Sequence, residues 1–507
     1  MVTETVDKKT LWTVIWASSI GTLIEWYDFY IFGTLTAIIS TQFFPSDNPT
    51  AALLAALAAF AAGFLVRPFG ALFFGRLGDL IGRKYTFLVT LLIMGLSTFA
   101  IGLIPSYKVF AGAPYIVLLL RLLQGLALGG EYGGAATYVS EHVTAKDRGY
   151  YTSFIQTTAT LGLFLALGVI WLTKKQVGAD AFNDWGWRIP FLISSLLVAV
   201  SVYIRLKMAE SPLFSKIKKE GKISKNPLKE SFGNKENLKM VLLALFGATA
   251  GQGVVWYTGQ FYANSFIQNT LKVHDDQRIS LMLIAIALAT PFFVVFGGWS
   301  DKVGRKWIMM VGMLIAVCTY MPIYKTMDSL ANGAQKTVNT EGVYKTSNIA
   351  ADIKNPLDSI LTTVSKTHYT DGTYIEETTK QTQFSDAKKP VLKPDTKKTV
   401  WLSPSNYWFM LFLVFIQIIY VTMVYGPIAA FLVELFPTRI RYSSMSLPYH
   451  VGNGIFGGLT PFIATALAAA GGAAKFNGLY YPIAIGAITF VIGTIFLSNK
   501  IDEDVLD

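Results

Sequence analysis

The chain carries the sequence GRLGDLIGRK at residues 75–84 and a matching sequence, GGWSDKVGRK, at residues 297–306. The two stretches share the pattern Gly-x-x-x-Asp-x-x-Gly-Arg-Lys and lie 222 residues apart. A second landmark follows each of them: Glu141, with an Arg seven residues later and a Ser five beyond that, and Glu434 with the same spacing. These second landmarks lie 293 residues apart, so the later copy holds about 71 additional residues. The chain is therefore predicted to consist of two related halves, of which the second contains an insertion.

The composition indicates a membrane protein. Hydrophobic residues make up 52% of the 507 residues and charged residues only 15%, which is too little charge for the surface of a large soluble protein. The apolar residues form blocks of about 20, the length of a helix that crosses roughly 30 Å of hydrocarbon. The first block begins near Leu11 and lacks a small-residue cleavage site, so we expect it to be a retained helix. Twelve spans are predicted, near 11–41, 50–75, 86–104, 115–140, 150–172, 188–208, 238–268, 278–300, 306–324, 406–427, 440–466 and 478–499.

Lys and Arg are concentrated in alternate connections between the predicted spans. One set of connections holds Arg83 and Lys84, Arg305 and Lys306, and a Lys-rich connector at about 209–237. By the positive-inside rule this set is cytoplasmic, and so are both termini. The net charge of +11 therefore reflects membrane topology, and no nucleic-acid partner is expected. The single cysteine, Cys318, excludes an internal disulfide, and the four histidines do not cluster, so we expect neither a metal site nor a cofactor.

A parallel repeat of two six-helix halves is the architecture of major facilitator transporters, and the duplicated loop motif resembles the motif of that superfamily. More narrowly, the chain resembles the metabolite:proton symporter family, which includes proline/betaine, α-ketoglutarate, citrate and shikimate carriers. The narrower resemblance rests on EWYDFY at 25–30, RPFG at 67–70, RLLQG at 121–125, GGEYGG at 129–134, WRIPF at 187–191, ESPLF at 210–214 and ELFPTR at 434–439. It implies an all-α membrane fold of twelve transmembrane helices in two six-helix bundles, at residues 1–208 and 238–507, joined by a connector at 209–237.

The repeated loop motifs are predicted to form a gate. An Asp near the N-terminus of another helix is favoured by the helix dipole by roughly 0.3–1 kcal/mol. The resemblance implies that Asp79 occupies such a position and that Arg83 bridges toward Glu141, closing the inner side while the outer side is open. The remaining gating residues expected from the repeat are Arg148, Asp301, Arg305, Glu434 and Arg441. Alternatively, these charges only anchor the loops among lipid headgroups.

Ionisable residues within the predicted spans mark candidate sites, because each costs about 2.5–3.5 kcal/mol on insertion scales. At about 1.5 Å per residue, Glu25 and Arg121 lie at the same depth and Asp28 lies one turn higher. These three residues and Gln124 are the predicted proton-coupling and substrate site, since a proton can compete with an Arg–carboxylate bridge. Alternatively, Asp28 and Arg121 only brace the first bundle.

A second pair of intramembrane charges lies closer to the inner side. Arg67 and Glu131 are at matching depth, and we expect them to form a buried structural or gating pair.

The second half offers polar and aromatic residues at membrane depth in place of charges. The predicted cavity lining consists of Gln252, Trp256, Tyr257, Gln260, Tyr420, Tyr425, His450 and Asn453. Aromatic rings can hold a quaternary ammonium by cation–π attraction, although such residues also serve as ordinary packing. His450 is either a proton relay or a buried, hydrogen-bonded histidine.

The insertion covers about residues 325–400 and is polar and Thr-rich. The Asp371-Gly372 pair predicts a small hairpin, with a mobile loop as the alternative. It is expected on the outer side, and no function is assigned to it.

The expected function is proton-coupled symport of a small polar metabolite, in the inner membrane of a bacterium, by a monomer. The cavity offers few cations, which favours a zwitterion or monocarboxylate such as proline, a betaine or a shikimate-like acid. The alternatives are a di- or tricarboxylate symporter, for α-ketoglutarate or citrate, and a non-transporting receptor on the same scaffold. An enzyme is not expected, because the sequence shows neither a nucleophile–base constellation nor a phosphate-binding loop. The expected partners are the substrate, protons and the lipid bilayer.

Overall fold

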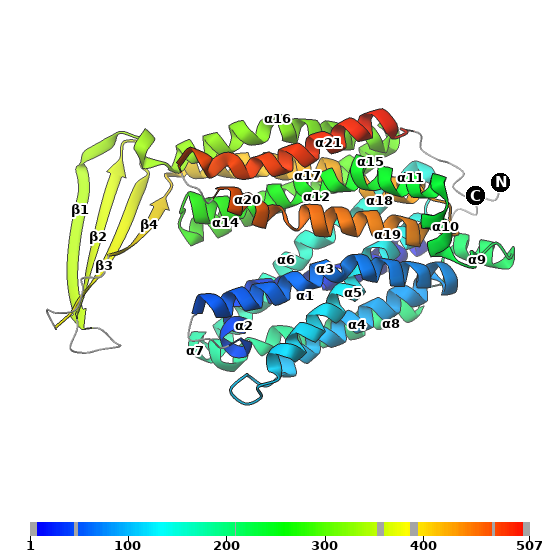
Figure 1. Ribbon diagram of the computed structural model, residues 1–507, viewed down its shortest axis with the longest axis horizontal. Coiled ribbons are helices and arrows are strands. Elements are labelled where there is room, and N and C mark those ends of the chain that lie inside the picture. Colours follow the sequence, from blue (N-terminus) through cyan, green and yellow to red (C-terminus); the bar gives the residue numbers. More distant parts are fainter. Residues whose placement is uncertain are drawn as a thin grey trace.

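The fold was determined as a computed structural model, which describes residues 8–44, 49–207, 209–351, 359–385, 394–468 and 472–499. Helices make up most of the chain, and a four-stranded sheet projects from one end of them (Figure 1). The opposite end carries the short helices that connect the two halves. We refer to these ends as the sheet end and the connector end.

The helices of the first half form one bundle. They are α1 (Lys8–Thr34), α2 (Thr36–Phe43), α3 (Pro49–Ile81), α4 (Arg83–Leu103), α5 (Ala113–Ser140), η1 (Ala145–Asp147), α6 (Arg148–Val177), α7 (Ala179–Ala181), η2 (Phe182–Gly186) and α8 (Arg188–Lys207). The connector contains α9 (Pro212–Lys219) and α10 (Pro227–Gly233).

The helices of the second half form the other bundle. Before the sheet these are α11 (Lys235–Ala244), η3 (Leu245–Thr249), α12 (Ala250–Tyr257), η4 (Thr258–Tyr262), α13 (Ala263–Ser265), η5 (Phe266–Thr270), α14 (Asp275–Ala289), α15 (Pro291–Val303), α16 (Arg305–Ala331) and η6 (Gly333–Gln335). After the sheet these are α17 (Pro404–Tyr425), α18 (Ile428–Glu434), α19 (Arg441–Val451), η7 (Gly452–Gly457), α20 (Thr460–Ala468), η8 (Gly472–Leu479) and α21 (Tyr480–Phe496).

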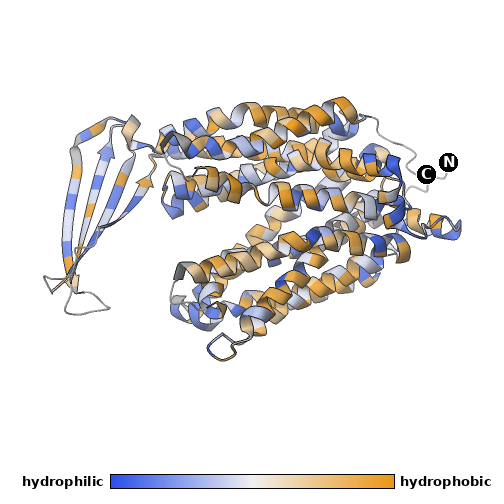
Figure 2. Cartoon of the chain, in the orientation of Figure 1, coloured by the Kyte–Doolittle hydropathy of each residue, from blue (hydrophilic) through white to orange (hydrophobic). Residues whose placement is uncertain are grey.

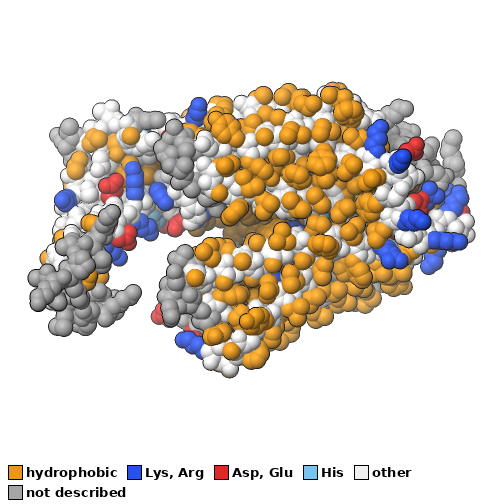
Figure 3. Space-filling view, viewed as in Figure 1, with side chains coloured by type: hydrophobic (Ala, Val, Ile, Leu, Met, Phe, Trp, Pro, Cys, Tyr) orange, Lys and Arg blue, Asp and Glu red, His pale blue; other side chains and the backbone are white. Residues whose placement is uncertain are grey.

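Eleven helical stretches of the described residues are long and apolar enough to cross a membrane, and each coincides with a predicted span. The remaining predicted span, 11–41, falls on α1 and α2. Helix α1 is 27 residues long, and its polar residues, among them Glu25 and Asp28, lower its apolar character. Hydrophobic residues colour the helices along their length, and their side chains cover the flank of the helical part (Figures 2 and 3). The all-α membrane fold predicted from the sequence is therefore confirmed.

The loop motifs break the helices at their glycines. Gly82 separates α3 from α4 with φ of 124°, and Gly304 separates α15 from α16 with φ of 95°. A residue with a Cβ is strained in this left-handed region. The motif therefore turns the chain sharply at the connector end and leaves its Asp and Arg on either side of the turn.

The insertion forms a sheet in which β1 (Val338–Ala351), β2 (Ser359–Tyr369), β3 (Tyr374–Gln383) and β4 (Asp395–Trp401) follow one another in order. All neighbouring strands are antiparallel, with Thr363 opposite Ser347 and Thr379. The hairpin predicted at Asp371-Gly372 is confirmed as the turn between β2 and β3, although no sequence pattern predicted the other two strands. In Figure 1, β4 lies nearest the helices and β1 farthest from them.

The sheet is fixed to the second half at the base of β4. The N–H of Val400 donates to the carbonyl of Lys272 at 2.8 Å, and the carbonyl of Val400 accepts from the N–H of His274 at 2.9 Å. The side chain of Gln277 bonds both backbone groups of Leu402, at 2.8 and 3.0 Å. Val400 itself is buried. The sheet therefore continues the packing of the second bundle.

Candidate functional site

The two halves meet at the connector end, where the motif aspartates bind backbone N–H groups of the opposite half. Asp79, at the end of α3, accepts from Tyr442 at 3.3 Å and from Ser443 at 2.8 Å, in the first turn of α19. Asp301 repeats the arrangement near the end of α15. It accepts from Gly149 at 2.8 Å and from Tyr150 at 2.7 Å, in the first turn of α6. Each aspartate thus caps a helix of the other half, where the helix dipole favours a negative charge.

Two ion-pair clusters surround these caps. In the first, Arg83 lies 3.1 Å from Asp79 and 3.5 Å from Glu141, which also binds Arg441 of the second half at 3.1 Å. In the second cluster, Arg305 lies 2.7 Å from Asp301 and 3.0 Å from Glu434.

Arg148 of the first half completes the second cluster at 3.0 Å from Glu434. The side chains of all eight predicted gating residues are at most 8% exposed. Charges that only anchored loops among headgroups would be exposed, so the burial favours a closed contact between the halves.

The connector contributes to the first cluster, a role that was not predicted from the sequence. Glu210 accepts from the backbone N–H of Arg83 at 3.1 Å, and the hydroxyl of Ser211 donates to Glu141. The ring of Phe214 lies 4.6 Å from the guanidinium carbon of Arg83. All three belong to the stretch ESPLF at 210–214, so the indication was in the sequence.

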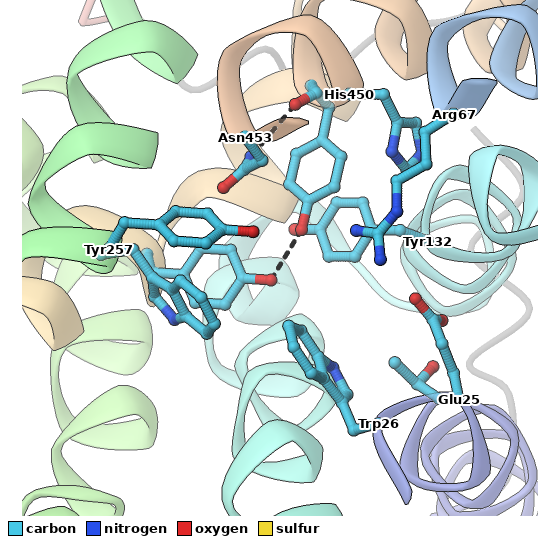
Figure 4. Close-up of a pocket in the computed structure, with 11 residues that line it drawn as sticks. Glu25, Trp26, Arg67, Tyr132, Tyr257, His450 and Asn453 are labelled. Carbon is cyan, nitrogen blue, oxygen red and sulfur yellow. Dashed lines mark hydrogen bonds between the residues drawn. The ribbon is translucent and has the colours of Figure 1, made fainter. Parts of the chain in front are cut away.

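Toward the sheet end the bundles spread apart, and a hollow opens between them (Figures 1 and 3). A chamber lies at the centre of the molecule, between the halves (Figure 4). Its lining from the first half is Thr22, Glu25, Trp26, Arg67 and Tyr132, and from the second half Trp256, Tyr257, Tyr425, Tyr449, His450 and Asn453. The chamber has a volume of only about 20 Å³, which is too small for a metabolite. The side chains must therefore move before a solute can bind.

Glu25 and Arg67 are the charged residues of the chamber wall, and Figure 4 shows both side chains pointing into the same space. The guanidinium carbon of Arg67 lies 4.3 Å from the ring centre of Phe64, and its charge has no ion-pair partner among the described residues. Glu25 is buried, and its Oε2 has no hydrogen-bond partner in the described part of the chain. A buried carboxylate without a partner is costly, and taking up a proton removes that charge.

Aromatic rings from both halves form the opposite wall of the chamber. The ring of Tyr449 stacks on that of Tyr132 at 3.6 Å, and the hydroxyls of Tyr449 and Tyr425 are 2.6 Å apart. Asn453 exchanges hydrogen bonds with Gln252 at 3.0 and 2.9 Å. Gln252 thus supports the wall from behind, whereas five other predicted second-half residues, Trp256, Tyr257, Tyr425, His450 and Asn453, line the chamber directly.

Two of the predicted lining residues lie elsewhere. Gln260 faces a wider vestibule nearer the sheet end, and Tyr420 accepts a hydrogen bond from Thr319 at 3.2 Å, away from the chamber. The π-helical turns η3, η4 and η5 interrupt the predicted seventh span, and such turns rotate the side chains that follow them. The prediction assumed a regular helix and therefore misplaced Gln260.

The vestibule has a volume of about 480 Å³ and lies between α1 and α6 of the first half and α14 of the second. It is separated from the chamber by Trp26 and Trp256, whose ring centres are 5.4 Å apart. Tyr30 stacks on Trp26 at 5.8 Å from the vestibule side. The two tryptophan rings therefore block the way from the vestibule to the chamber.

The predicted pair of Arg67 and Glu131 is wrong. Glu131 instead binds Arg205 of α8 at 2.7 Å and accepts from the hydroxyl of Thr90 at 2.8 Å. Matching depth along two helices does not show which helix faces which, and here the cation that faces Glu131 comes from α8. Arg205 also donates to the carbonyl of Phe87, so this pair ties three helices of the first bundle together.

The predicted site of Glu25, Asp28, Arg121 and Gln124 is divided in the structure, because only Glu25 lines the chamber. Asp28 accepts from Thr98 at 2.7 Å, Gln124 donates to Thr98 at 2.6 Å, and Arg121 donates to Gln124 at 2.8 Å. This buried chain of hydrogen bonds supports the alternative in which Asp28 and Arg121 brace the first bundle.

Comparison with known proteins shows what the chain resembles. The sequence profile of the family described as "Sugar (and other) transporter" matches residues 13–340. A proline/betaine transporter of Salmonella typhimurium is 34% identical over 64% of this chain and 66% of its own length, slightly less than two thirds. A putative metabolite transport protein of Haemophilus influenzae is 30% identical over 98% of this chain and 96% of its own length.

Two further proteins extend the comparison. The alpha-ketoglutarate permease of Escherichia coli is 34% identical over 65% of this chain and 75% of its own length. Among solved structures, that of the proton:xylose symporter XylE superposes with a TM-score of 0.69 at 16% identity, covering 97% of this chain and 96% of that one. At that identity the likeness shows a shared fold.

Proposed function

This chain belongs to the sugar and other transporter family of the major facilitator superfamily, and on that premise we propose that it is a proton-coupled symporter of a small polar metabolite. The proposed mechanism is alternating access, in which the two bundles rock around the central chamber. The observation that carries the proposal is the chamber itself. It joins a carboxyl, Glu25, and a cation without an ion-pair partner, Arg67, at the interface of the two halves.

The proposed orientation places the connector end in the cytoplasm, with both termini, and the sheet end outside, in the inner membrane of a bacterium. The Lys-rich connector supports this orientation by the positive-inside rule. In that orientation the structure is closed toward the cytoplasm, and its vestibule opens outward. The substrate would then enter from the sheet end and displace Trp26 and Trp256. We propose that a single chain suffices for this cycle.

In the proposed coupling, Glu25 carries the proton and Arg67 binds a carboxylate of the substrate. A protonated Glu25 leaves Arg67 free for the substrate, whereas a deprotonated Glu25 competes for it. Binding of both the proton and the substrate therefore neutralises the charges of Glu25 and Arg67. This lowers the cost of keeping the two side chains buried within the membrane while the bundles move. Asp28 has a separate, bracing role in this scheme.

The composition of the chamber wall supports the proposed substrate class. One cation beside several aromatic rings suits a zwitterion with one carboxylate, since rings attract a quaternary or secondary ammonium. The proline/betaine transporter among the relatives agrees with this choice. A dicarboxylate is the second candidate. The alpha-ketoglutarate permease among the relatives fits that alternative.

The test is uptake by the purified protein in proteoliposomes with an imposed pH gradient, using labelled proline, glycine betaine, a shikimate-like acid, α-ketoglutarate and citrate. Proton-coupled symport requires accumulation above equilibrium that collapses when an ionophore removes the gradient. Flux that does not depend on the pH gradient would indicate a facilitator, and substrate binding without flux would indicate a receptor.

A further inference from the structure

A second polar cavity lies at the base of the sheet, apart from the chamber and the vestibule. It has a volume of about 150 Å³ and is bounded by the segment after η5, the end of α16, η8 and strand β4. Each segment supplies a charged or polar side chain, among them Lys272, Asp328, Lys398 and Lys475. It is therefore built jointly by the sheet and by the helices of the second half.

Positive charge exceeds negative charge in this cavity. Lys475 binds Asp328 at 2.6 Å, so these two charges balance. Lys272 and Lys398 have no ion-pair partner among the described residues. The C-terminal end of α16 adds about half a negative charge from its helix dipole. Two lysines against roughly half a negative charge leave the cavity with a net positive charge.

The backbone of Lys272 gives an independent indication. Its φ is 58°, and it is the only residue other than glycine with a positive φ in the part of the chain described. A side chain in this left-handed region is strained, and strain of this kind gathers at ligand-binding positions. The hydrogen bond from Val400 to its carbonyl holds the residue in place. A glycine would make the turn without strain, so packing alone does not explain a lysine that faces the cavity.

We propose that this cavity is an oxyanion site that takes a phosphate group between Lys272 of the second bundle and Lys398 of the sheet. The bound group would give both ammonium groups a partner and would join the sheet to the helices. Two sources share this chemistry: the headgroup of an anionic phospholipid in the outer leaflet, and free phosphate.

A bound oxyanion stabilises the folded chain in proportion to its occupancy. For the full-length protein in a zwitterionic detergent, we expect 10 mM phosphate to raise the Tm by about 2–4 °C relative to chloride at equal ionic strength. Phosphate also stabilises proteins by exclusion from their surfaces, so the comparison that decides is between variants. K398Q should lose the response, whereas K397Q should keep it. Lys397 is the matched control because it carries the same charge on the opposite face of β4 and does not line the cavity.

K272G provides a second variant in which folding is not at risk. Glycine removes the amine and relieves the strain, so the Tm without phosphate should rise while the response to phosphate disappears. A response to phosphate that persists in both K272G and K398Q would overturn the proposal, as would an equal loss in K397Q.

Nanodiscs distinguish the two sources. If the ligand is a lipid headgroup, nanodiscs with phosphatidylglycerol should raise the Tm of the wild type above that in phosphatidylcholine alone, and K398Q should abolish the difference. If the ligand is free phosphate, the two lipids should give the same Tm and added phosphate should raise it in both. No K398Q-sensitive shift with either ligand would refute the site.

Discussion

Asp79 accepts a hydrogen bond of 2.8 Å from the backbone N–H of Ser443, although 364 residues separate them in the chain. The contact places a carboxylate of one half at the first turn of a helix in the other half. Asp301 makes the equivalent contact in the opposite direction. The closure of the connector end therefore depends on two crossed helix caps, each supported by an arginine of its own loop motif.

Asp79→Asn should weaken this closure. A hydrogen bond to a charged group contributes about 1.5–3 kcal/mol, so the balance between closed and open connector ends should shift roughly 10-fold or more. Labelling of a cysteine placed in the first turn of α19 should become faster, and uptake should slow. Asp301→Asn should act in the same direction, whereas Asp395→Asn, on the exposed part of β4, should leave both readouts unchanged. A normal transport rate and normal labelling in Asp79→Asn would refute the gate.

Glu25→Gln should abolish accumulation driven by a pH gradient and leave exchange of labelled for unlabelled substrate intact, because exchange needs no net movement of protons. Asp28→Asn should keep gradient-driven accumulation, since Asp28 lies outside the chamber. Uptake and counterflow in proteoliposomes measure both. If Asp28→Asn alone removed the gradient dependence, the proton would be on Asp28 and the assignment to Glu25 would fail.

Arg67→Gln should raise KM for the transported carboxylate far more than it lowers kcat. Removing one partner of a buried, hydrogen-bonded charge pair costs about 2 kcal/mol or more, which corresponds to roughly 30-fold in KM. Arg67→Lys should recover part of the affinity. An amide analogue of the substrate, which lacks the negative charge, should bind wild type and variant equally. An unchanged KM would exclude Arg67 as the carboxylate receptor.

Arg205→Gln should destabilise the protein, because it leaves Glu131 buried without its cation. Breaking a buried pair in this way costs about 3–5 kcal/mol, and Tm measurements in detergent should show a clear fall. The double change Arg205→Gln with Glu131→Gln should restore much of the loss. Arg67→Gln should leave the Tm close to that of the wild type. If Arg67→Gln lowered the Tm and Arg205→Gln did not, the result would support the pair of Arg67 with Glu131 that was predicted from depth alone.

Asp371 provides a pH-dependent prediction for the base of the sheet. Burial alone would raise its pKa, but hydrogen bonds from Lys336, Thr373 and Asn406 lower the pKa from 3.8 to about 2. Because the folded pKa is the lower one, the stabilisation is present above pH 4 and disappears as the pH falls toward 2. Asp371→Asn should therefore make the sheet more sensitive to proteolysis at pH 7 but not at pH 2. Equal sensitivity at pH 7 would contradict this role.

The sequence predicted those features that depend on repetition and periodicity. The eight residues of the two ion-pair clusters were identified because the motif occurs twice in register. The spans were identified because apolar blocks of membrane length are unambiguous. Features that depend on the rotation of a helix about its axis were not predictable. Depth alone placed Arg67 opposite Glu131, and the orientation of α8 that brings Arg205 there has no local sequence pattern. The π-helical turns around Trp256 likewise moved Gln260 out of the chamber.

The strands of the sheet could not be predicted from the sequence for a different reason. Its strands are polar and Thr-rich, and both faces lie largely in solvent, so alternation between apolar and polar residues is weak. Only the Asp371-Gly372 turn was recognisable, because a tight turn is a local feature. The residues that fix the sheet, such as Val400 and Gln277, are far apart in the sequence and carry no common pattern.

The attachment of the sheet makes it a lever. The described hydrogen bonds between the sheet and the helices all involve residues of the second half, so the sheet should turn with that bundle as one body. Strand β1 has 14 residues, which at about 3.3 Å per residue gives an arm of roughly 46 Å. A rotation of about 10° would then displace the far end of the arm by roughly 8 Å. A spectroscopic label on β1 would therefore move farther than one on the helices during the same rotation. Its displacement would report the position of the second bundle.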